Sequence, residues 1–199
     1  MTNGERTTIL PGEKTPVLPE VMEASYPGDP DLWSENPVAR ARRGLKGHTS
    51  YKAALGTFPL ENEDNILCTM SWVEWSKDDY VTFNITLDQN RILTLKIYRF
   101  DYPTIATVTG PNWSGFTYIR LNMVGYQKLN VTIKDLKING TVLGQYSSKG
   151  GDRTWFFRNK AKRDIPFTSI DISGKLLFSE AAAKKFFHQI PRFDFIFGC

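Results

Sequence analysis

The feature that most constrains the fold is a series of ten short runs that begins near residue 66 and ends near residue 197. Each run is rich in Val, Ile, Thr, Phe and Tyr, and turn-forming residues separate it from the next run. Because no long helical pattern intervenes, this spacing predicts an all-β fold, namely an antiparallel two-sheet sandwich of the jelly-roll or lectin-like kind. The expected strands are 66–76, 80–88, 92–100, 104–109, 116–123, 129–138, 142–146, 154–158, 167–178 and 193–197.

Several runs alternate apolar and polar residues, as a strand with one buried face requires. The run 81–87 is apolar at every second position, while the run 129–138 slips by one residue at Lys134–Asp135. Such a slip predicts a β-bulge, and Asn139-Gly140 between two runs predicts a tight hairpin. We expect the following side chains to be buried between the sheets: Phe83, Ile85, Leu95, Ile119, Leu121, Ile133, Trp155, Leu176 and Phe195.

The N-terminal part of the chain has a different composition. Pro and Gly punctuate residues 1–35, and Pro favours extended or turn-like backbone. We therefore predict two parts, an extended N-terminal arm over residues 1–60 and a β-sandwich domain over residues 61–199. Ser34 as an N-cap and Pro37 in the first turn predict a short helix over residues 38–43. A second short helix is predicted over residues 180–188, where Ala, Lys and Phe follow Ser179.

Charge is segregated along this predicted arm, although the net charge of the whole chain is only +4. Residues 1–35 hold seven acidic and two basic residues, whereas residues 36–60 hold five basic and no acidic residues. Such a dipolar segment suits self-association or docking on a protein partner, while five charges make a weak site for nucleic acid. A solvated helix end is the alternative interpretation. The predicted partner-binding residues are Leu32, Trp33, Arg40, Arg42, Arg43, Lys46, Tyr51 and Phe58.

Sequence signatures of the common enzyme classes are missing, and no apolar run is long enough for a membrane helix. The two histidines, His48 and His188, are isolated from plausible catalytic partners. We therefore expect no enzyme activity, no cofactor and no metal, with a calcium site at an acidic pair as the alternative. Cys68 and Cys199 are predicted to be free thiols or, alternatively, a disulfide.

Tryptophans are the best candidates for ligand contacts. Trp72 and Trp75 have opposite parity on one predicted strand, so we expect one of them to face solvent. Trp113 lies in a predicted turn, where it either plugs the end of the sandwich or contacts a ligand. Trp75 and Trp113 are therefore the residues predicted to bind a ligand such as a glycan.

A distinctive order of segments runs through the C-terminal 60% of the chain. It comprises residues 88–95, 116–121 and 131–144, then Trp155 after a Gly-rich turn, then residues 167–176 and 192–198. In this order the chain resembles bacterial, largely cyanobacterial, surface-associated β-sandwich proteins of the choice-of-anchor type. The resemblance implies a surface or extracellular location and no settled activity. Residues 1–10 lack the apolar core of a secretory signal, and no sorting segment follows Gly198, which favours a structural subunit instead.

Taken as a whole, the sequence predicts a non-catalytic structural or assembly protein. The sandwich supplies rigidity, and the N-terminal arm docks on neighbouring subunits or partners. The alternative function is that of a carbohydrate-binding surface module.

Overall fold

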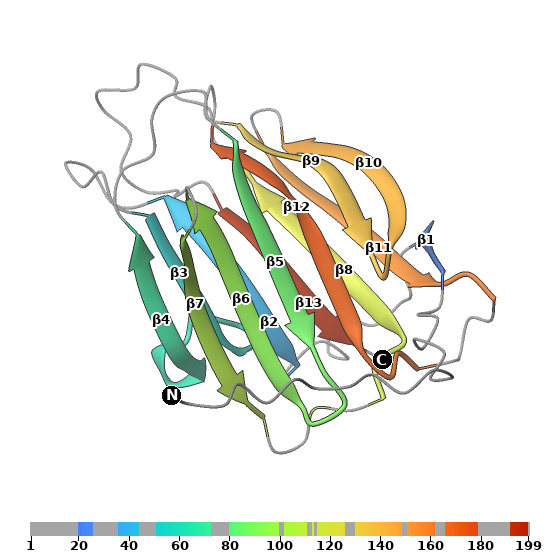
Figure 1. The fold of residues 1–199 in the computed structure, drawn as a ribbon, viewed down its shortest axis with the longest axis horizontal. Coiled ribbons are helices and arrows are strands. Elements are labelled where there is room, and N and C mark those ends of the chain that lie inside the picture. Colours follow the sequence, from blue (N-terminus) through green and yellow to red (C-terminus); the bar gives the residue numbers. More distant parts are fainter. Residues whose placement is uncertain are drawn as a thin grey trace, which may run out of the picture.

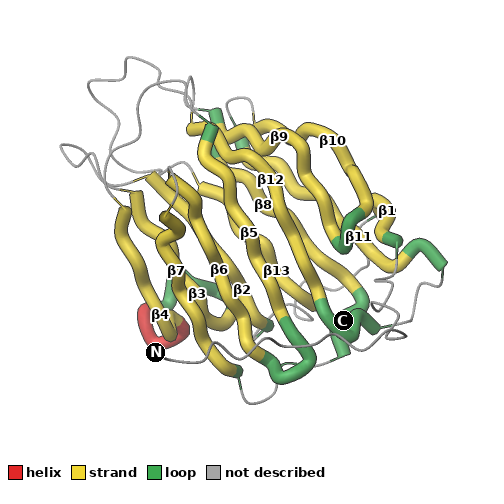
Figure 2. The backbone as a smooth tube through the Cα atoms, viewed as in Figure 1, coloured by secondary structure: helices red, strands yellow, loops and turns green. Residues whose placement is uncertain are grey.

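Two antiparallel β-sheets pack face to face in the computed structural model of the chain (Figure 1). The structure describes residues 20–25, 36–43, 51–72, 80–99, 102–110, 113, 115–125, 130–148, 151–161, 166–178 and 192–198. The predicted all-β antiparallel sandwich is confirmed, since the described elements are strands and one 3-10 turn. That turn, Glu63–Asn65, directly precedes β4 and is the red segment in Figure 2.

The seven-stranded sheet has the strand order β1-β11-β8-β13-β2-β3-β4. Although β13 follows every other strand in chain order, it lies in the middle of this sheet, where it pairs with β8 and β2. The strands are β1 (Val21–Ala24), β2 (Pro37–Arg43), β3 (Tyr51–Thr57), β4 (Ile66–Trp72), β8 (Tyr118–Val124), β11 (Asp152–Asn159) and β13 (Arg192–Gly198).

The six-stranded sheet has the order β10-β9-β12-β5-β6-β7. Its edge strand β7 contacts β4 at one side of the sandwich, and β10 contacts β1 and β11 at the other (Figures 1 and 2). The strands are β5 (Val81–Leu87), β6 (Ile92–Arg99), β7 (Tyr102–Thr109), β9 (Val131–Ile138), β10 (Thr141–Ser148) and β12 (Ile170–Phe178).

Aromatic side chains join the two sheets at the centre of the core. The ring of Phe83 on β5 lies 5.3 Å from that of Phe193 and 6.1 Å from that of Phe195, both on β13. Eight of the nine side chains predicted to be buried are buried, and Trp155 is partly buried against the same core. The alternation of apolar and polar residues therefore determines which face of each strand is buried in the core.

Two local irregularities confirm the predictions for β9. The register with β12 shifts between Ser173 and Lys175, and Asp135 has a φ of 53°, as expected of an extra residue in a bulge. Asn139 and Gly140 both have positive φ, 51° and 79°, which is the backbone that a two-residue hairpin needs.

Where the structure describes β1, β2 and β3, the N-terminal 60 residues belong to the seven-stranded sheet and do not form a separate arm. Residues 38–43 belong to strand β2 rather than to a helix, and β2 and β3 are integral strands of the seven-stranded sheet. Ala39 and Ala41 face the core while Arg40 points to the other face, so the period is two rather than 3.6. The helix predicted over 180–188 lies outside the described residues. Among the residues that are described, no helix could cross a membrane.

Candidate binding sites

The predicted partner-binding residues fall into three groups. Leu32, Trp33 and Lys46 lie outside the described residues. Arg43 and Tyr51 occupy paired register positions on β2 and β3, and their side chains are not described. The side chains of Arg40, Arg42 and Phe58 are described, and all three lie on or against the outer face of the seven-stranded sheet.

That outer face carries a small apolar cluster of its own. The cluster consists of Val38, Leu60, Tyr118, Phe156 and Ile196, and Phe58 packs against it. The segment that leads from β3 to β4 supplies Phe58 and Leu60, and the guanidinium of Arg120 lies 5.7 Å from the centre of the Phe58 ring. Phe58 therefore packs against side chains of its own chain, next to the guanidinium of Arg120 on β8.

Next to the apolar cluster lies a group of charged side chains that we call the arginine cluster: Arg40, Arg42, Glu61, Arg192 and Asp194. Arg40 donates from Nε to Asp194 Oδ1 at 2.6 Å and from Nη2 to Oδ2 at 3.1 Å. Glu61 Oε1 lies 2.9 Å from Nη2 of Arg40 and 2.9 Å from Nη2 of Arg192. Arg40 is thus satisfied by two carboxylates of its own chain.

Arg42 differs from Arg40 although both lie on the same face of β2. Its Cα pairs with that of Arg192 on β13, so two arginines stand side by side. Burial, followed by the charges of Arg40 and Arg192, lowers the pKa of the Arg42 guanidinium. Of the residues predicted to bind an acidic partner, Arg42 is the one whose described surroundings are electropositive.

Sequence reasoning did not single out Asp194 and Glu61, the anionic members of this cluster. A signal for Asp194 exists, because it interrupts the aromatic run of β13 at a position of opposite parity to Phe193 and Phe195. Parity places Asp194 on the outer face, yet its side chain is only 1% exposed. An acid in a strand of such apolar composition indicates a buried cation as its partner.

The second candidate site is a pocket of about 300 Å³ at the end of the sandwich where β5 turns into β6; we call it the turn-end pocket. Trp113, Phe116 and Phe167 contribute aromatic walls, and Trp113 is only 5% exposed. The two interpretations of Trp113 are thus compatible, because the same indole closes the core and lines a pocket. Trp75 lies outside the described residues. The remaining lining residues are Leu87, Asp88, Gln89, Arg91, Gly115, Thr168, Ser169 and Ile170.

Backbone hydrogen bonds hold the three segments around this pocket together. The amide of Phe167 donates to the carbonyl of Phe116 at 2.7 Å. The amide of Gly110 donates to the carbonyl of Arg91 at 3.2 Å. Asp88 Oδ1 accepts from the amides of Asn90 and Ile92, both at 2.9 Å, and so fixes the β5–β6 turn. The pocket is therefore preformed by a rigid frame.

Gly110 sets the position of the Trp113 ring. A Cβ at residue 110 would lie 2.0 Å from Trp113 Cδ2, so the indole rests directly on the glycine backbone.

Cys68 is a half-buried free thiol. Within the described ranges, no three His, Cys, Asp or Glu side chains come together as a metal site would need.

Comparison of the sequence with protein-family models and with curated proteins found no match. The resemblance to choice-of-anchor proteins therefore stays a prediction, and the candidate sites are argued from their own geometry.

Proposed function

We propose that this protein is a non-catalytic binding module that holds a small carbohydrate ligand in the turn-end pocket. The observation that carries the proposal is the mixed lining of that pocket, in which aromatic side chains form the walls and polar groups the rim. Sugars need this combination, because their C–H faces pack on aromatic rings while their hydroxyls hydrogen-bond to polar side chains. The volume of about 300 Å³ suits a single sugar ring rather than a chain.

The composition of the lining favours binding over catalysis. Among the described lining residues Asp88 is the one acid, and its Oδ1 already accepts two backbone hydrogen bonds of its own turn. Glycoside hydrolysis ordinarily needs two carboxylates that flank the bond to be broken. Among the described lining residues there is also no histidine, cysteine or lysine, so the hydroxyls of Thr168 and Ser169 have no such base beside them to activate a nucleophile.

The test blocks the pocket without touching the buried tryptophan. Thr168 is exposed at the rim, so Thr168→Trp fills the entrance with an indole. Thr107→Trp is the matched control, because Thr107 is an exposed threonine on β7 that is not among the lining residues. Binding of a panel of neutral monosaccharides is measured by saturation-transfer NMR. We expect one or more sugars to bind the wild type and the control but not Thr168→Trp; binding that survives the block contradicts the proposal.

The assembly function predicted from the sequence is the second proposal. It is favoured by the two neighbouring edge strands β4 and β7, which pair with no further described strand and carry the exposed side chains Leu67 and Ile105. The double variant Leu67→Lys/Ile105→Lys is expected to reduce self-association in sedimentation velocity. Val142→Lys, at an exposed position on the opposite edge strand β10, is the control and should leave the mass unchanged.

A further inference from the structure

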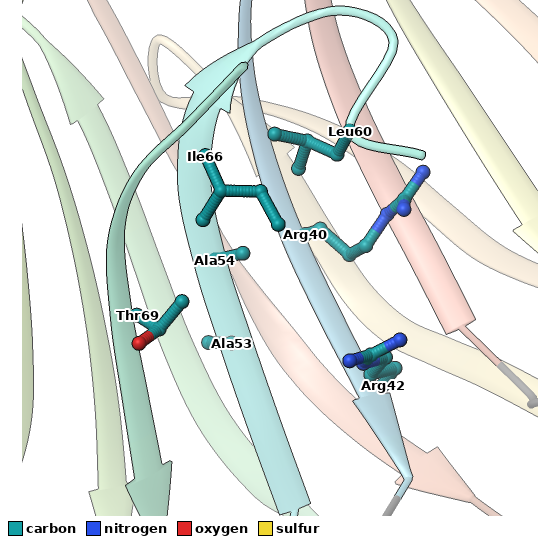
Figure 3. Close-up of a pocket in the computed structure, with 7 residues that line it drawn as sticks. All are labelled: Arg40, Arg42, Ala53, Ala54, Leu60, Ile66 and Thr69. Atoms are coloured by element: carbon teal, nitrogen blue, oxygen red, sulfur yellow. The ribbon is translucent and has the colours of Figure 1, made fainter. Parts of the chain in front are cut away.

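A hollow beside the arginine cluster is separate from the turn-end pocket and lies on the outer face of the seven-stranded sheet (Figure 3). Its volume is about 140 Å³, which is large enough to hold several water molecules. In Figure 3 the two arginines of β2 stand on one side and Thr69 of β4 on the other, with Ala53 and Ala54 of β3 between them. The hollow exists because the small side chain of Ala54 on β3 lies next to the long side chain of Arg40 on β2.

Among the described residues, the positive and negative charges around this hollow do not balance. Arg40 and Arg192 share Glu61 and Asp194 between them. Among the described residues, no carboxylate forms an ion pair with Arg42, so three guanidinium groups face two carboxylates. Burial and the neighbouring cations lower the pKa of Arg42, which is the expected sign for a cation in a site that is short of negative charge.

We infer that this hollow binds one carboxylate group carried on a short aliphatic chain, with the guanidinium of Arg42 as its cationic partner. The planar fork of a guanidinium matches the two oxygens of a carboxylate. Leu60, Ile66 and Ala54 line the same space, so the methylene groups next to the carboxylate have an apolar wall to contact. Inorganic phosphate has the negative charge but no methylene groups that could contact this apolar wall.

Two sources can supply such a group, and they share its chemistry. One source is a free short-chain carboxylate, and the other is an acidic side chain of a partner protein. Both form the same ion pair and bury the same few methylene groups. The acidic side chain also requires the mouth of the hollow to admit a peptide backbone, and the free carboxylate does not. An experiment with a free carboxylate and with a short acidic peptide therefore distinguishes the two sources.

The experiment is a titration of the full chain, followed by ¹H–¹⁵N NMR at constant ionic strength. The probes are sodium propionate, sodium phosphate and the tripeptide Ala-Glu-Ala with blocked ends. We expect propionate to shift the amide signals of Ala54 and Thr69 in a saturable manner. Arg42→Gln should weaken this binding roughly tenfold or more, because it removes a charge-assisted pair. The control Arg153→Gln, at an exposed position on β11 of the same sheet, should leave it unchanged.

A second variant separates the site from simple charge attraction. Ala54→Leu fills the hollow but keeps every arginine, and it should abolish the propionate shift. Binding of the tripeptide as well as propionate supports a protein side chain as the ligand, and binding of propionate alone supports a free carboxylate. Three results overturn the inference: no saturable shift with propionate, equal affinity in Arg42→Gln and wild type, or tighter binding of phosphate than of propionate. Arg42→Gln should keep the melting temperature of the wild type, since Arg42 has no described carboxylate partner.

Discussion

Nε of Arg40 donates a 2.6 Å hydrogen bond to Oδ1 of Asp194, which joins the neighbouring strands β2 and β13 across 154 residues of sequence. The side chains of Arg40 and Asp194 are 6% and 1% exposed, so neither charge retains its hydration. Burial lowers the pKa of Arg40, but Asp194 and Glu61 outweigh this effect and raise it. The ion pair thus fixes the register of the two central strands, because a slip of one residue leaves both charges buried and unpaired.

Removing one partner of this pair is expected to destabilise the fold strongly. Arg40→Gln should lower the free energy of unfolding by about 3–5 kcal/mol, because it leaves the Asp194 carboxylate buried without its main cation. The double variant Arg40→Met/Asp194→Leu should recover most of that loss, since both desolvated charges are gone. Urea denaturation of Arg40→Met, Asp194→Leu and the double variant measures the coupling. A double variant as unstable as the sum of the single ones contradicts this account.

Stability should fall in acid, in part through Glu61. Burial raises the pKa of Glu61, but the charges of Arg40 and Arg192 outweigh this and hold the pKa below its usual range. A carboxyl with a depressed pKa in the folded state contributes stability above its unfolded pKa of about 4.3, and this is lost as the pH falls through the folded pKa. Because half of the Glu61 side chain is exposed, Glu61→Gln should cost only about 1 kcal/mol or less at pH 7. Urea unfolding of both proteins across the acid range should show the difference vanishing at the lowest pH. A constant difference at every pH argues against the charge as its origin.

The hairpin between β9 and β10 should depend on glycine at one position. Gly140 has a φ of 79°, and a Cβ added there meets no atom within 4 Å. Gly140→Ala should therefore lower the free energy of unfolding by about 1–2 kcal/mol through backbone strain alone. Gly151 is the matched control, because a Cβ there also meets nothing within 4 Å and its φ lies outside the positive region. Thermal unfolding should show a loss for Gly140→Ala and no loss, or a small gain, for Gly151→Ala.

The edge strand β1 should loosen when one hydroxyl is removed. The Tyr146 hydroxyl on β10 donates to Glu23 Oε2 at 3.1 Å and so links β1 to the opposite sheet. Burial, then the charge of Glu23, raises the pKa of Tyr146 well above its usual range, which keeps this donor protonated in alkaline solution. Tyr146→Phe should cost about 0.5–1.5 kcal/mol and speed hydrogen exchange of the amides of Val21–Ala24. Tyr98→Phe on β6 is the control, and equal exchange in both variants refutes the role of the bond.

Most strands of the sandwich could be predicted from local sequence patterns. The runs with period-two alternation became strands, and the slip at Lys134–Asp135 became a bulge, because each signal concerns residues close in sequence. Strand β2 was mistaken for a helix because Ser34 and Pro37 are typical of a helix start, and Ala and Arg do not oppose one. Its alternation is visible once Ala39 and Ala41 are known to face the core. Tertiary packing overrode the local propensity there.

The candidate sites were less accessible from the sequence. Arg40 and Arg42 look equivalent in a run of basic residues. What separates them is Asp194, which lies 154 residues further along the chain, and no local signal pairs it with one arginine rather than the other. Trp113 was identified as a candidate for ligand contact, but the segment around Phe167 that completes its pocket comes from another part of the chain.

The central position of β13 has a consequence for synthesis. Within the seven-stranded sheet, β13 alone connects the group β1, β11 and β8 to the group β2, β3 and β4. A ribosome makes β13 after all the others, so the growing chain carries two half-sheets whose facing edges, on β8 and β2, have no partner. Open strand edges of this kind are sites where nascent chains can pair with one another, so this interval is the one most exposed to aggregation. Closure is then a single late event, when Arg192–Gly198 inserts between the halves and brings Asp194 to Arg40.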